Sequence, residues 1–183
     1  MKWLITAFEP FDGAASNSSQ QFLSELEKHF AGNSRLVFHS QVPVTFKGAW
    51  PDVYKKISSI PDLVGVLALG QAETRSRICL EYLSINRVDA RIKDNEGILP
   101  PLGPLKAGTD VRWSDIPWDQ FQLQAAKVER SYSAGSFVCN ALMFELLEWA
   151  EMQNKFAGFV HVPLFDEALC PEMHKILEFV LDL

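Results

Sequence analysis

The sequence of 183 residues lacks an excess of positive charge and lacks any long apolar run. Lysine and arginine number 17 against 23 acidic residues, a net charge of -6, so we expect no surface for nucleic acid or for an anionic membrane. No stretch approaches the roughly 20 apolar residues of a membrane helix. The apolar run after Lys2 is too short for a secretory signal. These absences predict a cytoplasmic protein that acts on small molecules or proteins.

Cysteine is also scarce. Cys79, Cys139 and Cys170 are scattered, which excludes a disulfide framework and a CxxC metal pair, and no pair of potential ligands has a zinc-like spacing. We therefore expect free thiols. The segment from Ile98 to Gly108 is rich in proline and glycine, but its flanks have similar compositions, so it is expected to be an irregular loop. Residues 1–183 are then predicted to form a single domain.

Four short apolar segments predict strands that are buried on both faces. They are Trp3 to Phe8, Leu63 to Leu69, more weakly Ser131 to Ala134, and Gly158 to Val162. Apolar residues at helical spacing predict a helix over Phe22 to Phe30 and another after Cys139. This alternation favours an α/β fold, a three-layer α/β/α sandwich with a mostly parallel twisted sheet. The alternating run from Arg77 to Ile92 is interpreted as a hairpin or an edge extension.

The carboxyl ends of parallel strands meet at one edge of such a sheet, where ligands bind. That edge is predicted to gather aromatic, amide, cationic, thiol and imidazole groups. They belong to Phe8, Phe11, Gln71, Arg75, Cys139 and His161.

Cys139 is the best placed of the three thiols. It follows Gly135 and Ser136 and precedes an amphipathic pattern, so it should lie in the first turn of a helix. The unpaired N–H groups there are expected to lower the pKa of the thiol and to hold an oxyanion. The alternative is that Cys139 is a buried apolar residue, as free cysteines often are.

A thiol nucleophile needs a base and a group that orients the base. Among four histidines, only His161 ends an apolar strand, although a histidine there can also be a core residue. Glu81 is the carboxylate most embedded in apolar sequence, and the alternative places it on the wet face of a strand. Three other acidic residues compete with Glu81 for this role, in a run that resembles a polar loop. They are Asp89, Asp94 and Glu96.

At these residues the chain resembles the type I pyroglutamyl peptidases, also called pyrrolidone-carboxylate peptidases, which are cysteine peptidases. The matching blocks occur in the family order and span most of the chain. They are TAFEPFDG (6–13), GQAETR (70–75), LEYLSINRVDARIKDNEG (80–97), YSAGSFVCN (132–140) and GFVHVP (158–163).

The resemblance implies an α/β sandwich with a catalytic triad of Cys139, His161 and Glu81 that removes N-terminal pyroglutamate from small peptides through an acyl-enzyme. It also implies that Arg91 supports the oxyanion and that no metal or cofactor is needed. Whether the protein forms a homo-oligomer is left open. The positions matched to substrate binding are Phe8, Phe11, Asn17, Gln71 and Phe137.

The chain departs from the family pattern in four places. Ala7 replaces a glycine, and Glu73 and Thr74 replace a pair of glycines. Ser18 replaces the proline of an Asn-Pro-Ser pattern, and Ala141 replaces the histidine that follows Asn140. A loop that used positive φ at the glycine pair must change shape. Two alternatives follow: a cysteine amidase for another small cyclic or N-acyl group, and a binding protein without catalysis.

Overall fold

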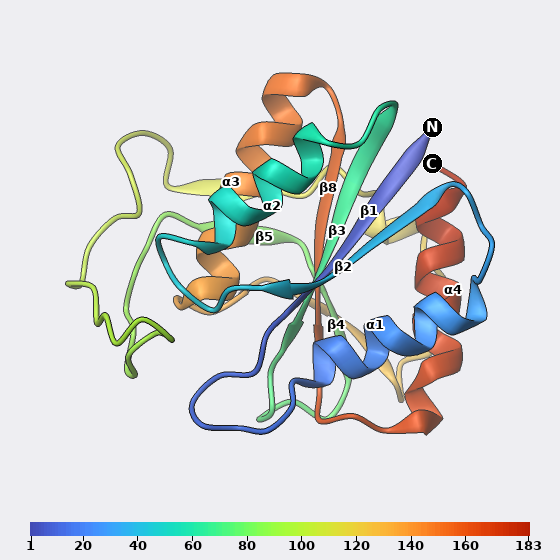
Figure 1. The fold of residues 1–183 in the computed structure, drawn as a ribbon, viewed down its shortest axis with the longest axis horizontal. Coiled ribbons are helices and arrows are strands. Elements are labelled where there is room, and N and C mark those ends of the chain that lie inside the picture. Colours follow the sequence, from blue (N-terminus) through green and yellow to red (C-terminus); the bar gives the residue numbers. More distant parts are fainter.

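The structure is a computed structural model that describes residues 1–183, and a six-stranded sheet forms its central layer (Figure 1). The strands of this sheet are β1 (Lys2–Phe8), β2 (Leu36–Val42), β3 (Leu63–Gln71), β4 (Ile78–Glu81), β7 (Val128–Ser131) and β8 (Phe156–Val162). The helices are α1 (Ser18–His29), α2 (Ala49–Ser58), α3 (Val138–Gln153) and α4 (Cys170–Leu181). The helices α1 and α4 cover one face, and α2 and α3 cover the other. The predicted three-layer α/β/α sandwich is therefore confirmed.

The strand order is β2-β1-β3-β8-β4-β7, and the first four strands run parallel to one another. β4 is antiparallel to β8, and β7 is parallel to β4. The sheet is thus mostly parallel, as predicted. The weakly predicted strand at 131–134 lies earlier, at Val128–Ser131.

The interpretation of residues 77–92 as a hairpin or an edge extension is wrong. β4 is fully buried between two neighbours of the central sheet, and β5 (Leu83–Ile85) then leaves that sheet to pair with β6 (Val111–Trp113) in a separate two-stranded ribbon. The alternating pattern correctly predicted extended backbone, but β4 and β5 belong to different sheets.

Each face of the sheet has its own apolar core, and glycines let bulky side chains lie flat on it. Trp3 packs on the face covered by α1 and α4, where its ring stacks on Phe156 at 5.9 Å between centroids. A Cβ atom at Gly65 would lie 2.5 Å from the Trp3 ring, so only glycine allows this packing. The longest helix, α3, has 16 residues, and no helix in the structure meets the length and apolarity of a bilayer span.

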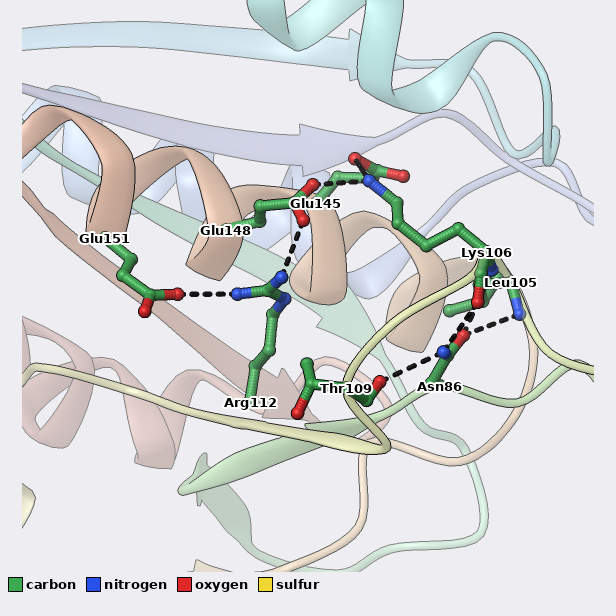
Figure 2. Close-up of polar contacts among 8 residues, drawn as sticks. All are labelled: Asn86, Leu105, Lys106, Thr109, Arg112, Glu145, Glu148 and Glu151. Carbon is green, nitrogen blue, oxygen red and sulfur yellow. Dashed lines mark hydrogen bonds and ion pairs between the residues drawn. The ribbon is translucent and has the colours of Figure 1, made fainter.

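The irregular segment that contains residues 98–108 is held in place by one half-buried side-chain amide, that of Asn86 (Figure 2). The Asn86 Oδ1 atom accepts hydrogen bonds from the backbone N–H groups of Leu105 and Lys106, at 2.8 and 3.1 Å. The Asn86 Nδ2 atom donates to the carbonyls of Lys106 and Thr109, at 2.7 and 3.0 Å. One side chain therefore replaces the backbone pairing that this stretch lacks.

Ion pairs then tie the same segment to α3, as Figure 2 shows. Lys106 Nζ contacts Glu145 at 2.8 Å and also Glu148, while Arg112 contacts Glu148 and Glu151 at 2.6 Å each. Because α3 begins at Val138, this network connects the segment to the helix that carries Cys139 near its start.

Asn86→Ala is expected to loosen the segment without unfolding the sheet. The substitution leaves two backbone N–H groups without acceptors, which costs roughly 1–3 kcal/mol locally. Limited proteolysis should cut near residues 98–110 faster than in the wild type, whereas Glu151→Ala, which removes one exposed ion pair, should leave the cleavage rate nearly unchanged. Equal protection of the Asn86→Ala variant and the wild type would contradict this account.

Candidate active site

A buried carboxylate and imidazole form the centre of the site. In the antiparallel pair of β4 and β8, Glu81 lies opposite Phe159, so its side chain is on the same face as His161. The Glu81 Oε1 atom is 2.7 Å from His161 Nδ1, and the two residues are 0% and 4% exposed. Nδ1 must carry the hydrogen in this bond, because a carboxylate accepts. The Nε2 atom of neutral His161 is therefore the basic nitrogen.

Arg75 is the cation that compensates the buried charge of Glu81. Its Nη1 atom lies 3.2 Å from Glu81 Oε1 and donates to Ser131 Oγ at 3.0 Å, while Nη2 donates to the Ser133 carbonyl at 2.7 Å. The Glu81 Oε2 atom has no hydrogen-bond partner. Arg75 thus connects the carboxylate to the segment that precedes Cys139.

The competing carboxylates lie elsewhere. Asp94 accepts hydrogen bonds from the backbone N–H groups of Phe46, Glu96 and Ile98, which makes it an organiser of its loop. Asp89 and Glu96 are exposed. Of the four candidates, the structure brings only Glu81 to His161.

One small pocket collects all of the predicted substrate-binding residues. It encloses about 130 Å³, and its lining contains no charged carboxylate, ammonium or guanidinium group. The lining residues are Phe8, Phe11, Asn17, Val44, Gln71, Ala134, Phe137, Cys139 and His161. All five positions predicted for substrate binding therefore line the same pocket as the Cys139 thiol and the His161 imidazole.

The segment 132–137 brings Cys139 to this pocket. The sequence predicted that the strand before Cys139 ends at the pocket. β7 runs antiparallel to β8, however, so its carboxyl end lies away from the pocket. Instead the chain crosses back after Ser131, and Ala134 and Phe137 line the pocket on the way. α3 then begins with Cys139 in its first turn, as predicted.

The start of α3 is open for a ligand. Phe137 is the N-cap residue and provides no side-chain cap, and the backbone N–H groups of Val138, Cys139 and Asn140 make no hydrogen bond to another residue. Gly70 allows β3 to approach this turn closely. A Cβ atom at Gly70 would lie 3.0 Å from Cys139 Sγ and 2.8 Å from the Phe159 ring.

The environment of the thiol differs from the sequence-based expectation. Burial, followed by the negative charge of Glu81, raises the pKa of Cys139 from 9.0 to about 12, although a backbone hydrogen bond acts in the opposite direction. The expectation of a lowered pKa is therefore wrong for the free protein: the backbone N–H at the helix start does lower the pKa of the thiol, but burial and Glu81 outweigh it. Cys139 is therefore a neutral thiol at physiological pH, and it can act as a nucleophile only after a base removes its proton.

The loop after β3 has no residue with positive φ at the two positions where the family pattern has glycines. Glu73 and Thr74 are exposed, and neither has a positive φ. The Arg75 N–H donates to the Ala72 carbonyl at 2.9 Å, which closes a turn that needs no glycine. The loop therefore delivers Arg75 to Glu81 with ordinary backbone angles.

Asn140 is a structural determinant of the site that the sequence reasoning did not assign. Its buried Oδ1 atom accepts from Ile85 N at 3.0 Å and Ser84 Oγ at 2.8 Å, and Nδ2 donates to the Ile85 carbonyl at 2.8 Å. These bonds attach β5 to the first turn of α3. Its position directly after Cys139 in a matching block was the available signal.

The remaining predicted residues lie outside the pocket. Arg91 is exposed and does not line it. Cys79 donates to Glu129 at 3.2 Å, and burial raises its pKa from 9.0 to about 11. No group of three or more histidine, cysteine or acidic side chains is arranged to hold a metal ion.

The protonated thiol predicts a distinctive alkylation profile. In the free protein, iodoacetamide should modify Cys139 at least about tenfold more slowly than a small free thiol at pH 7.5, because few molecules carry the thiolate. The rate should still rise between pH 9 and pH 10. Mass spectrometry that resolves each cysteine measures this directly, and a plateau below pH 8 would contradict the raised pKa.

The chain is similar to known proteins over nearly its whole length. A family model described as pyroglutamyl peptidase matches residues 1–177. The pyrrolidone-carboxylate peptidase of Erwinia tasmaniensis is 37% identical over 172 residues, which cover 91% of this chain and 79% of that protein. The protein of the same name from Thermococcus onnurineus is also 37% identical, over 91% of this chain and 86% of its own length.

Solved structures give the same result. A mutant pyrrolidone carboxyl peptidase from Pyrococcus furiosus has a TM-score of 0.86 and 26% identity, and the match covers 100% of this chain and 99% of that chain. Pyroglutamyl peptidase I from Bacillus amyloliquefaciens has a TM-score of 0.82 and 28% identity, with 97% and 93% covered. The chain therefore belongs to the pyroglutamyl peptidase family.

Proposed function

We propose that this protein is a cysteine exopeptidase that removes the N-terminal pyroglutamyl residue from small peptides. The observation that carries the proposal is the pocket itself, which combines Cys139 and His161 with aromatic and amide side chains and has no charged group in its lining. Pyroglutamate is a flat, uncharged lactam. A free α-ammonium group would need a carboxylate in the pocket, and none lines it.

Three phenylalanines supply the apolar surface for the ring. Phe8, at the end of β1, is 2% exposed, and its ring centroid is 6.3 Å from that of Phe159. Phe137 is held edge-on by Phe46, with 5.4 Å between the ring centroids. With Phe11 they form a rigid wall against which a planar lactam can pack.

The proposed catalytic triad is Cys139, His161 and Glu81. Because the thiol of Cys139 is protonated at rest, attack on the scissile carbonyl begins with transfer of its proton to His161 Nε2. The sulfur bonds to the carbonyl carbon, and Glu81 stabilises the imidazolium through the 2.7 Å bond to Nδ1. The imidazolium then gives its proton to the departing amine. His161 activates water in the second half of the reaction, which releases pyroglutamate.

The developing oxyanion needs hydrogen-bond donors. We assign this role to the unpaired N–H groups in the first turn of α3, which belong to the same turn as the nucleophile. Arg91 is proposed to support them. Its block matches the family, and its exposed side chain forms no ion pair within the chain.

Hydrolysis of a pyroglutamyl amide with a fluorescent leaving group tests the proposal. Under reducing conditions the wild type should release the amine, and Cys139→Ala should lower kcat/KM by about a thousandfold or more. Cys139→Ser is the matched control that retains a hydroxyl nucleophile and should be similarly inactive. A wild type that prefers another N-acyl amide, or variants that retain full turnover, would refute the proposed function.

Arg75 is proposed as a positioning residue that acts through Glu81. Arg75→Gln removes a charge-assisted bond to a buried carboxylate, so kcat should fall by about 10- to 100-fold. The acid limb of the pH profile of kcat/KM should move to higher pH. Without the neighbouring guanidinium, the buried pair of Glu81 and His161 takes up a proton more easily. Arg75→Lys should restore part of the activity.

Arg77 offers a matched control for this experiment. It lies in the same loop and carries the same charge, but it pairs with Glu129 at 2.5 Å instead of Glu81. Arg77→Gln should therefore leave kcat within about twofold of the wild type and leave the profile in place. If Arg77→Gln and Arg75→Gln shifted the profile equally, the general loss of charge and not the contact with Glu81 would be responsible.

A further inference from the structure

A second cavity lies outside the candidate active site. It encloses about 400 Å³ between the start of α2, the irregular segment around residues 98–108 and the first turns of α3. It shares no lining residue with the pocket that contains Cys139. The larger apolar side chains of its lining are Phe46, Trp50, Val88, Leu105 and Leu142. A cavity of this volume and composition suits a small, largely apolar molecule.

We infer that this cavity is a binding site for small aromatic carboxylates, separate from the candidate active site. The ring of the ligand packs against the apolar wall, and its carboxylate pairs with Lys47, which also lines the cavity. The inference goes beyond the proposed function and does not depend on it, because no residue of the catalytic pocket takes part.

The walls of the cavity are held in place without a ligand. On one side, Asn86 Oδ1 accepts a hydrogen bond of 2.8 Å from the backbone N–H of Leu105 (Figure 2). On another side, Asp94 Oδ2 accepts a hydrogen bond of 3.1 Å from the backbone N–H of Phe46. Two wall segments are thus fixed by side chains that do not line the cavity. A preformed cavity loses little conformational entropy when a ligand enters, which favours binding.

The charges of the lining favour an anion. Lys47 and Glu145 are the two charged residues of the lining. Glu145 is compensated by Lys106, whose Nζ atom lies 2.8 Å from its carboxylate, as Figure 2 shows. Lys47 is exposed and forms no ion pair. The uncompensated charge at the cavity is therefore positive, and a carboxylate is the group that complements it.

Ala141 leaves the cavity open on the side of α3. It lines the cavity at the position where the family pattern has histidine. A larger side chain at position 141 would project into this space, because the methyl group of alanine already faces it. The open volume therefore depends on a residue at which this chain departs from the family pattern.

Three probes that share a phenylpropyl body test the ligand class. They are 3-phenylpropionate, 3-phenylpropanol and 3-phenylpropylamine, which are anionic, neutral and cationic. In NMR titrations of the ¹⁵N-labelled protein, 3-phenylpropionate should bind with a Kd on the order of 1 mM and shift the signals of Trp50 and Ala141. The alcohol should bind about two- to fivefold more weakly, and the amine at least about fivefold. Equal affinities for the amine and the carboxylate, or shifts confined to the catalytic pocket, would overturn the inference.

Lys47→Gln tests the role of the cation. The substitution should raise the Kd of 3-phenylpropionate about two- to fivefold and leave that of the alcohol unchanged, because only the carboxylate loses a partner. Lys55→Gln is the matched control: it removes the same charge farther along α2, from a residue that does not line the cavity, and should leave both Kd values unchanged. If both variants weakened the carboxylate equally, the general charge of the protein would be responsible and the inference would fail.

Ala141→His tests the location of the site by filling it. At pH 8, where an unperturbed imidazole is neutral, the Kd of 3-phenylpropionate should rise at least about fivefold. Wild-type affinity in this variant, shown to be folded by its NMR spectrum, would overturn the inference, and the comparison of Lys47→Gln with Lys55→Gln decides the matter if it does not fold. None of these titrations requires turnover. A wild type that binds the probes but does not hydrolyse a pyroglutamyl amide would therefore refute the proposed function and leave this inference standing.

Discussion

The buried hydrogen bond between Glu81 and His161 is the constraint on which the rest of the site depends. A carboxylate that is fully removed from water costs several kcal/mol unless it is paired and hydrogen-bonded. Here the cost is offset by two partners on different segments, His161 on β8 and Arg75 in the loop after β3. This requirement explains why β4 is inserted between β8 and β7. An edge position would leave Glu81 in water, where its contacts are weak.

Burial, and after it the same buried charge of Glu81, explains the protonation state of Cys139, the proposed nucleophile. A helix N-terminus stabilises an anion by roughly 0.3–1 kcal/mol. A rise of the Cys139 pKa from 9.0 to about 12 corresponds to about 4 kcal/mol in the opposite direction. Burial and repulsion from Glu81 therefore outweigh the helix. The arrangement that orients His161, the proposed base, also keeps the thiol of Cys139 neutral in the free protein, so proton transfer and attack are linked in the proposed mechanism.

The sequence predicted the elements whose apolar pattern is local and missed those whose pattern is interrupted. β1, β3, β8, α1 and α3 were all found. α2 and α4 were missed, and each has a proline in its first turn, Pro51 and Pro171, which is tolerated there but is typical of a helix break elsewhere. β2 lies at the sheet edge, so its polar residues hid the strand. The central place of β4 depends on long-range pairing, which no local pattern encodes. Cys139, His161 and Glu81 were nevertheless identified as candidates, because each has a distinctive local context.

The neutrality of the pocket connects recognition with chemistry. No charged group lines the cavity, and the nearby carboxylate of Glu81 is already engaged by Arg75 and His161. A charged N-terminus therefore gains nothing on entering, whereas a lactam loses little hydration and packs against aromatic rings. In the proposed mechanism, net charge appears in the site only as the reaction proceeds, on the attacked carbonyl and on His161. Those are the two places where the structure supplies compensation, the open N–H groups of α3 and the carboxylate of Glu81. Stabilisation is thus reserved for the transition state, which is what accelerates a reaction beyond mere binding.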